Sequence, residues 1–233
     1  MKVSIILPTL NEEKNIFKIV KSIKKNTKSL KIEIIFVDDN SSDNTQSEII
    51  KVKKNFKNIK NIFRKERNLS TAFIEGMKIS SGNLIVLMDS DMQHDPKNIK
   101  KSIIKMQKSN FDMIIGSRFL KGSKNYKSTL KSWIRLFLSK SFINIFNLIF
   151  FSNISDPLSG FFVVKKSKII GKEKFLYKKG FKIVMDYYLL LKNKIKITEI
   201  PINLNKRQYG QSKLNFKILV LIIKQVIFYM KKW

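Results

Sequence analysis

Cysteine is absent from the 233-residue sequence, and histidine occurs only once, at His94. Without cysteine the chain has no disulfide bond and no zinc site built from thiolates. A single imidazole also excludes a metal site with several histidine ligands. Any metal site therefore has to use oxygen ligands, which Mg²⁺ and Mn²⁺ prefer.

Acidic residues are scarce as well, because 17 Asp and Glu stand against 47 Lys and Arg, which gives a formal net charge of +30. Residues 101–233 hold 28 basic and 5 acidic side chains, whereas residues 1–100 hold 19 and 12. This asymmetry favours an anionic partner for the second half, either a nucleic acid or an anionic membrane surface, although compositional drift toward lysine would also produce it. Only five of the basic residues are arginine and no nucleic-acid-binding motif is present, so we expect no nucleic acid as a partner.

Long hydrophobic runs are missing too. The nearest to one, residues 216–230, is interrupted by Lys217, Lys224 and Gln225, so we expect no transmembrane helix. The apolar run at residues 3–7 is too short for a signal peptide, and we expect the protein to start in the cytoplasm. Hydrophobic residues still make up 43% of the chain, which is enough to build a core and to exclude wholesale disorder.

Short β-branched runs alternate with helical patterns through the first 115 residues. We expect strands at 3–7, 32–37, 61–63, 84–88 and 113–115, and helices at about 12–25, from 43, at 69–80 and at 96–108. This alternation predicts an α/β fold with a mostly parallel central sheet, helices on both faces, and ligands beyond the carboxyl ends of the strands. No repeat or linker interrupts the chain, so residues 116–213 should continue the same domain.

Acidic residues follow two of the expected strands. Asp38 and Asp39 end one of them, and Asp89-Ser90-Asp91 ends another. Two carboxylates separated by one residue can point into one crevice, where their repulsion is costly unless a cation lies between them. Mg²⁺ or Mn²⁺ fits this pattern, since one or two carboxylates hold such an ion together with phosphate oxygens and water. A solvated turn is the alternative interpretation.

Seven segments occur in a characteristic order between residues 3 and 214. They are PTLNE at 8–12, VDDNSSD at 37–43, MDSDMQHDP at 88–96, GSR at 116–118, SDPLSGFF at 155–162, GFK at 180–182, and EIPI at 199–202 with RQYGQSK at 207–213. In this order they resemble the polyprenol-phosphate (dolichol-phosphate type) mannosyltransferases, which are inverting glycosyltransferases of family 2 with the GT-A fold. The fifth and last segments are the ones specific to this branch of the family.

The resemblance implies a role for individual residues. The donor nucleotide sugar would contact Pro8, Leu10, Glu12, Val37, Asp39, Asp89, Ser90, Asp91, Arg207 and Lys213. Mg²⁺ or Mn²⁺ would be held by Asp89, Asp91 and Gln93, and the acceptor phosphate by Arg118, Arg135 and Ser139. The residues carrying catalysis would be Asp89, Asp91, Asp156 and Arg207. Two positions depart from the family pattern: Leu10 replaces an aromatic residue, and Asn68-Leu69-Ser70 replaces Gly-Leu-Gly.

The function implied by the resemblance is transfer of mannose from GDP-mannose to a polyprenyl (dolichyl or undecaprenyl) phosphate with inversion. Glucose or another nucleotide sugar with the same lipid, or a non-lipid cell-surface glycan as acceptor, is the alternative. A phosphate monoester has a second pKa near 6, so it is largely ionised at neutral pH and needs orientation more than a general base. Asp156 is a candidate base, an orienting carboxylate or a turn cap, and we interpret His94 as structural.

Two segments have the pattern of helices at a membrane surface. Residues 133–151 interleave aromatic side chains with Arg135 and Lys140, which fits either a core-facing helix or an interfacial one. Residues 214–233 form a second candidate, which ends in Lys231-Lys232-Trp233. We therefore expect a catalytic domain at 1–213, with a nucleotide-binding half at 1–115 and an acceptor half at 116–213, and an amphipathic membrane-surface helix at 214–233.

From the two candidate membrane-surface helices we expect peripheral attachment to the cytoplasmic face of a membrane. A membrane protein is a possible further partner. The division into a catalytic domain and a membrane-surface helix also predicts that removal of residues 216–233 shifts the protein from the membrane to the soluble fraction and leaves donor binding largely intact.

Overall fold

The structure is a computed structural model that describes residues 1–124, 130–180, 182–209 and 216–232, without the side chains of residues 130–135, 216 and 217. Its strands are β1 (Lys2–Thr9), β2 (Lys31–Asp38), β3 (Ile59–Phe63), β4 (Leu84–Leu87), β5 (Met113–Ser117), β6 (Phe162–Lys165) and β7 (Ile197–Pro201). Its helices are α1 (Glu13–Asn26), α2 (Thr45–Asn55), α3 (Leu69–Ile79), α4 (Lys97–Ser109), α5 (Leu130–Ile149), α6 (Lys166–Ile169), α7 (Ile183–Leu191) and α8 (Phe216–Met230), with a short 3₁₀ helix η1 (Glu173–Phe175).

The seven strands form one sheet in the order β3-β2-β1-β4-β6-β5-β7. All neighbouring pairs are parallel except those of β6, which runs antiparallel to β4 and β5. The mostly parallel sheet predicted from the sequence is therefore confirmed, and the five expected strands are all present. Strand β6, which begins at the last residue of the SDPLSGFF segment, and strand β7 were not predicted.

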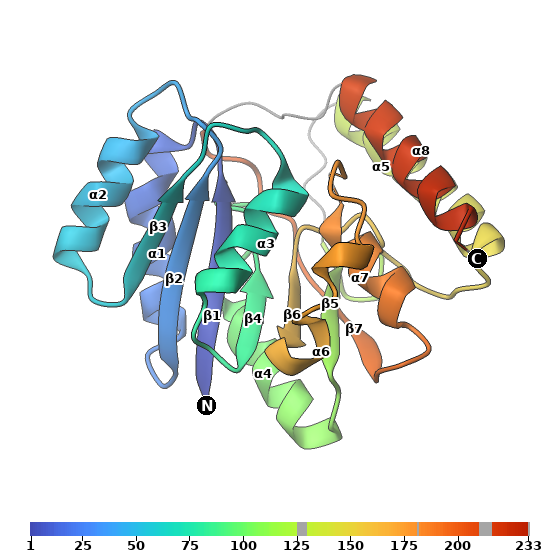
Figure 1. Ribbon diagram of the computed structural model, residues 1–233, viewed down its shortest axis with the longest axis horizontal. Coiled ribbons are helices and arrows are strands. Elements are labelled where there is room, and N and C mark those ends of the chain that lie inside the picture. Colours follow the sequence, from blue (N-terminus) through green and yellow to red (C-terminus); the bar gives the residue numbers. More distant parts are fainter. Residues whose placement is uncertain (125–129, 181, 210–215, 233) are drawn as a thin grey trace.

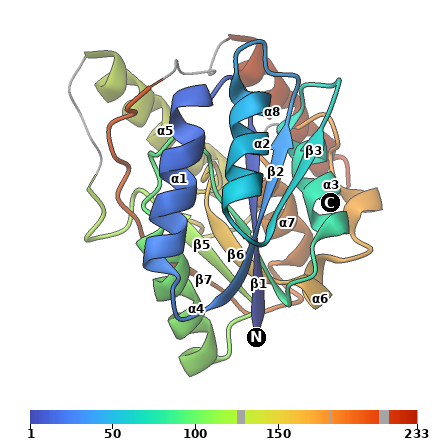
Figure 2. The same cartoon turned by 90° about the vertical axis from the view of Figure 1, so that its left-hand side faces the viewer.

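Helices cover both faces of this sheet, as Figures 1 and 2 show. Side chains of β1 alternate between the two sides, because successive residues of a strand point to opposite faces. Ile5 and Leu7 pack with residues of α1, α2 and α4, whereas Ile6 packs with residues of α3 and α7. Both faces are thus used for the core, which leaves the carboxyl ends of the strands for polar residues.

Helices α5 and α8 each have a buried and an exposed apolar face. Phe146 of α5, Phe150 just after it, and Val226 and Tyr229 of α8 belong to one core cluster. The outward faces carry exposed apolar side chains, which are Phe137, Leu138, Ile145 and Leu148 on α5, and Leu219, Ile223, Ile227 and Met230 on α8. Figure 1 shows both helices at the same end of the molecule. Within the described residues, none of the helices is long and apolar enough to span a membrane.

Candidate functional site

A cavity of about 180 Å³ opens at the carboxyl ends of β1, β2 and β4. It is lined by Pro8, Thr9, Leu10, Glu12, Asp39, Arg67, Asn68, Leu69, Leu87, Asp89, Ser90, Asp91, Ser159, Gly160, Lys182, Ile183 and Arg207. Parallel strands place the residues that follow them at one edge of the sheet, so segments far apart in sequence meet here. Most of the predicted donor residues lie in this lining.

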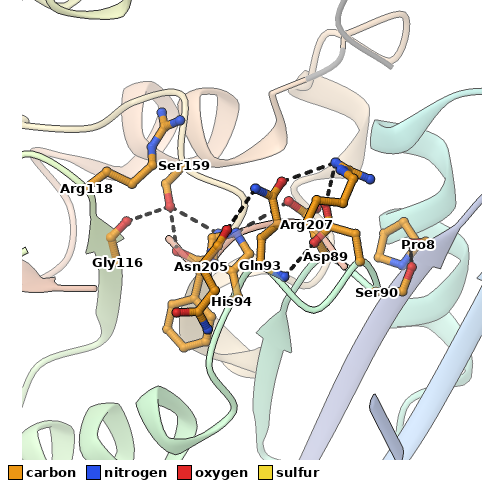
Figure 3. A network of polar contacts seen from close by, with 12 residues as sticks. Pro8, Asp89, Ser90, Gln93, His94, Gly116, Arg118, Ser159, Asn205 and Arg207 are labelled. Carbon is orange, nitrogen blue, oxygen red and sulfur yellow. Dashed lines mark hydrogen bonds and ion pairs between the residues drawn. The ribbon is translucent and has the colours of Figure 1, made fainter. Parts of the chain in front are cut away.

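Three of the predicted donor residues meet at one side of the cavity. The guanidinium of Arg207 lies 2.5 Å from a carboxylate oxygen of Asp91 and 3.5 Å from a carboxylate oxygen of Glu12. It also donates a hydrogen bond of 3.2 Å to the amide oxygen of Gln93, and Figure 3 shows these two side chains next to each other. Arg207 therefore joins the segment after β7 to the residues that follow β4.

Asp89 is held from another direction. Its carboxylate lies 3.4 Å from Nε2 of His94, a side chain that is almost fully buried. Any side chain at Gly160 would overlap the Asp89 carboxylate, so only glycine fits there. His94 is thus a buried neighbour of Asp89, and its structural role stays a prediction.

The two carboxylates have pKa values shifted in opposite directions. Burial acts to raise the pKa of Asp89, but the hydrogen bond and charge of His94, together with Lys182 and Arg207, hold it below its usual range. Burial and the negative charge of Asp89 raise the pKa of Asp91, although Arg207 opposes this. Repulsion between Asp89 and Asp91 is therefore only partly offset by their basic neighbours.

A divalent cation fits these residues. An ion between Asp89 and Asp91 would remove the repulsion that raises the pKa of Asp91, and carboxylate oxygens are suitable ligands for Mg²⁺ or Mn²⁺. Among the residues that the structure describes, no group of three or more His, Asp or Glu side chains could form a complete metal cage. The site therefore suits an ion whose remaining ligands are phosphate oxygens and water. The amide of Gln93 contacts Arg207 and donates to the Asn205 carbonyl, and its role as a third metal ligand stays a prediction.

Asp39 forms the opposite wall of the cavity with α3. It accepts hydrogen bonds from Arg64 (2.9 Å) and from the backbone N–H of Asn68 (2.8 Å). Burial raises the pKa of Asp39 to about 6 in spite of Arg64. The side chain of Asn68 caps α3 by accepting from the backbone N–H of Thr71. Although Asn68-Leu69-Ser70 departs from the family pattern, Asn68 and Leu69 still line the cavity.

The predicted acceptor residue Arg118 lies outside the cavity lining and is paired with Asp156. Its guanidinium donates two hydrogen bonds of 2.7 Å to the two carboxylate oxygens of Asp156, which is fully buried. Burial opposes the charge of Arg118, but Asp156 outweighs it and raises the pKa of Arg118. Both oxygens of Asp156 therefore bind Arg118, and its role as a base or as an orienting carboxylate stays a prediction.

Four predicted site residues need separate mention. Val37 is fully buried in the core and does not line the cavity. Ser139 is partly exposed on α5 and does not line it either. The side chain of Arg135 and the whole of Lys213 lie outside the described residues.

Sequence reasoning assigned no role to several cavity residues. Arg67 is one of only five arginines, and that rarity was an available signal. Gly160 and Lys182 belong to two of the seven segments. Arg64 lies behind the lining and contacts Asp39, Asn68 and Thr71, and nothing in its local sequence indicates this.

Several known proteins are similar to this chain in sequence. The family model described as Glycosyl transferase family 2 matches residues 4–170. The chain is 37% identical over 239 residues to the dolichol-phosphate mannosyltransferase of Pyrococcus furiosus, covering 100% of this chain but 64% of that protein. It is 28% identical to the dolichol-phosphate mannosyltransferase of Saccharomyces cerevisiae, covering 96% of this chain and 85% of that protein.

Among solved structures, the chain is similar to glucosyl-3-phosphoglycerate synthase from Mycobacterium tuberculosis, crystallised with Mn²⁺, UDP and glucosyl-3-phosphoglycerate. The TM-score is 0.72 at 16% identity, and the match covers 99% of this chain and 79% of that one. At this identity the likeness is one of fold, and it confirms the expected GT-A architecture.

Proposed function

The chain belongs to glycosyl transferase family 2, and on this premise we propose that it transfers mannose from GDP-mannose to a polyprenyl phosphate with inversion at the anomeric carbon. The observation that carries the proposal is the similarity over at least 96% of the chain to three proteins named dolichol-phosphate mannosyltransferase. The chain spans 64% of the length of the Pyrococcus furiosus relative. The activity of that longer protein is therefore assigned to this chain as a proposal only.

The donor is proposed to bind in the cavity beside Asp89 and Asp91. These two residues would hold Mg²⁺ or Mn²⁺, which when bound supplies positive charge to the departing diphosphate. Breaking the bond between the sugar and the diphosphate places negative charge on the β-phosphate. Arg207, which lines the same cavity, can stabilise that charge with its forked guanidinium, and Lys213 is expected to assist.

The acceptor phosphate is proposed to attack the anomeric carbon from the face opposite the diphosphate. A phosphate oxygen forms the new bond to carbon while the bond to the diphosphate oxygen breaks, which inverts the configuration. Because the acceptor is already ionised near neutral pH, the protein has to orient it rather than remove a proton. We assign the orientation to Arg118, Arg135 and Ser139, with Asp156 holding Arg118 in place.

The lipid part of the acceptor suggests that the protein works at a membrane surface. The exposed apolar faces of α5 and α8 lie at one end of the molecule and are accompanied by exposed Lys140, Lys224, Lys231 and Lys232. Apolar insertion combined with attraction to anionic lipid would attach these helices to the cytoplasmic face. A membrane protein bound to the same surface is the other possible anchor.

A product assay tests the proposed reaction. Purified protein is offered a panel of labelled nucleotide sugars with Mg²⁺ or Mn²⁺, with and without polyprenyl phosphate, and the organic phase is counted. We expect label in the organic phase with GDP-mannose and polyprenyl phosphate together. The free prenol is the matched control acceptor, and equal labelling of prenol and prenyl phosphate would contradict the proposal. If another nucleotide sugar is preferred, the proposed sugar is wrong, but the proposed lipid acceptor is retained.

A further inference from the structure

Helix α8 reaches the wall of the cavity through a single polar side chain. Gln225 is fully buried although it lies in the middle of a mostly apolar helix. Its amide nitrogen donates hydrogen bonds to the backbone carbonyl of Lys182 (3.1 Å) and to a carboxylate oxygen of Asp186 (2.6 Å). One side chain of α8 therefore contacts two points at the start of α7.

The carbonyl of Lys182 is the position from which α7 begins. It accepts hydrogen bonds from the backbone N–H groups of Met185 (3.1 Å) and Asp186 (3.4 Å), which form the first turn of the helix. The side chains of Lys182 and Ile183 line the cavity. A side chain that donates a hydrogen bond to the Lys182 carbonyl therefore fixes the part of α7 that faces the ligand.

The chain just before α7 is held from two sides. Ser70, on α3, donates a hydrogen bond of 2.8 Å to the carbonyl of Gly180. From the other side the amide group of Gln225 approaches so closely that a β-carbon at Gly180 would lie 2.8 Å from it. A side chain at Gly180 would have to displace this amide, so Gly180 lies clamped between α3 and α8.

We propose that Gln225 is a positioning residue for the donor cavity: from α8 it holds the carbonyl of Lys182 and thereby places Lys182 and Ile183 against the bound nucleotide diphosphate. In so far as it names the ligand, this inference rests on the proposed function. It assigns to α8 a role in donor binding in addition to its exposed apolar face. Helix α8 then serves two sites. Its exposed face is proposed to contact lipid, and its buried face supports the wall of the donor cavity.

This role conflicts with the expectation that donor binding is independent of residues 216–233. Removing α8 would leave the carbonyl of Lys182 without its hydrogen bond from Gln225 and would uncover Asp186. It would also remove Val226 and Tyr229 from the core. Loss of α8 is therefore expected to weaken donor binding as well as membrane attachment.

The test compares Gln225→Met, which keeps an unbranched side chain of similar length, with Val226→Ala on the neighbouring buried position. Val226 packs into the core and does not line the cavity, so its truncation destabilises α8 without removing a hydrogen bond to α7. Three quantities are measured on the full chain: the melting temperature, the Kd for GDP with Mn²⁺, and hydrogen exchange of the Met185 and Asp186 amides.

Both variants are expected to melt at a lower temperature than the parent protein. Only Gln225→Met is expected to raise the Kd for GDP, by about fivefold, which corresponds to ~1 kcal/mol for one lost hydrogen bond. The same variant should speed exchange of the two amides, whereas Val226→Ala should leave both quantities near those of the parent. Equal Kd values and equal exchange in the two variants would overturn the proposal.

A second variant guards against failure of Gln225→Met to fold. Ser70→Ala removes the hydrogen bond to Gly180 on the opposite side and should speed exchange of the same amides, whereas unchanged exchange would count against the clamp. If the parent protein itself binds no GDP, the proposed donor is wrong. Amide exchange still decides in that case whether Gln225 positions the start of α7.

Discussion

Replacing Asp186 by Asn should stabilise the protein increasingly as the pH rises. Asp186 is fully buried, and burial raises its pKa to about 7, although the hydrogen bond from Gln225 acts in the opposite direction. The folded protein therefore keeps this carboxyl protonated over a range in which the unfolded chain has released the proton.

The sign and size of the effect follow from this shift. Below about pH 4 the carboxyl is protonated in both states, so it adds no pH dependence. Between about pH 4 and pH 7 only the unfolded chain ionises, so the free energy of unfolding falls as the pH rises. A pKa moved from 3.8 to about 7 corresponds to about 4 kcal/mol of stability that is lost by neutral pH. Asn at this position cannot ionise, and the variant avoids that loss.

Urea unfolding followed by circular dichroism between about pH 4 and pH 8 measures the difference between the two proteins. We expect the stability of Asp186→Asn relative to the parent to rise by about 4 kcal/mol over this range. Asp112→Asn is the matched control, because Lys165 and its neighbours outweigh burial and lower the pKa of Asp112. Asp112 is therefore ionised in both states over most of this range, and the difference between Asp112→Asn and the parent should stay nearly constant with pH. A difference between Asp186→Asn and the parent that stays constant with pH would refute the reasoning.

Three further predictions concern the reaction and the membrane. Asp91→Asn should lower kcat by about a hundredfold because it removes charge needed for the cation, and full activity of the parent in excess chelator would contradict this. Arg135→Lys should raise the acceptor KM more than the donor KM in steady-state assays, since lysine keeps the charge and loses the fork; equal changes would refute the assignment. The double variant Ile223→Glu/Ile227→Glu should float with anionic liposomes less than the parent protein does, and unchanged flotation would exclude the exposed face of α8 as the membrane contact.

The carboxyl ends of the first strands were predictable from the sequence because two local signals coincide there. A short β-branched run predicts each strand, and the acidic residues that end it cannot be buried in the core without partners. Asp39 and Asp89 were placed in this way, and both line the cavity. The parallel arrangement then brings the two strand ends together without any information on side-chain contacts.

The pairing of buried charges was not predictable from local patterns. Asp156 and Arg118 are 38 residues apart, and local sequence leaves several roles open for Asp156 without indicating that Arg118 lies 2.7 Å from it. Arg64 and Asp39 are joined in the same way across 25 residues. Val37 illustrates the opposite error, since it belongs to a matching segment but its side chain points into the core. A motif identifies a segment, whereas the pleat of the strand decides which of its side chains face the ligand.

Helix α8 shows where hydropathy patterns stop being informative. Its apolar residues occur on both faces: Ile222 and Val226 are buried, whereas Ile223 and Ile227 are exposed. Periodicity cannot decide which face packs against the protein when both are apolar. Gln225 appeared in the sequence as an interruption of a hydrophobic run, but it is the residue of α8 that is fully buried and hydrogen-bonded to α7. A polar residue within an apolar helix is costly to bury without partners, so its position indicates the face on which tertiary hydrogen bonds are to be sought.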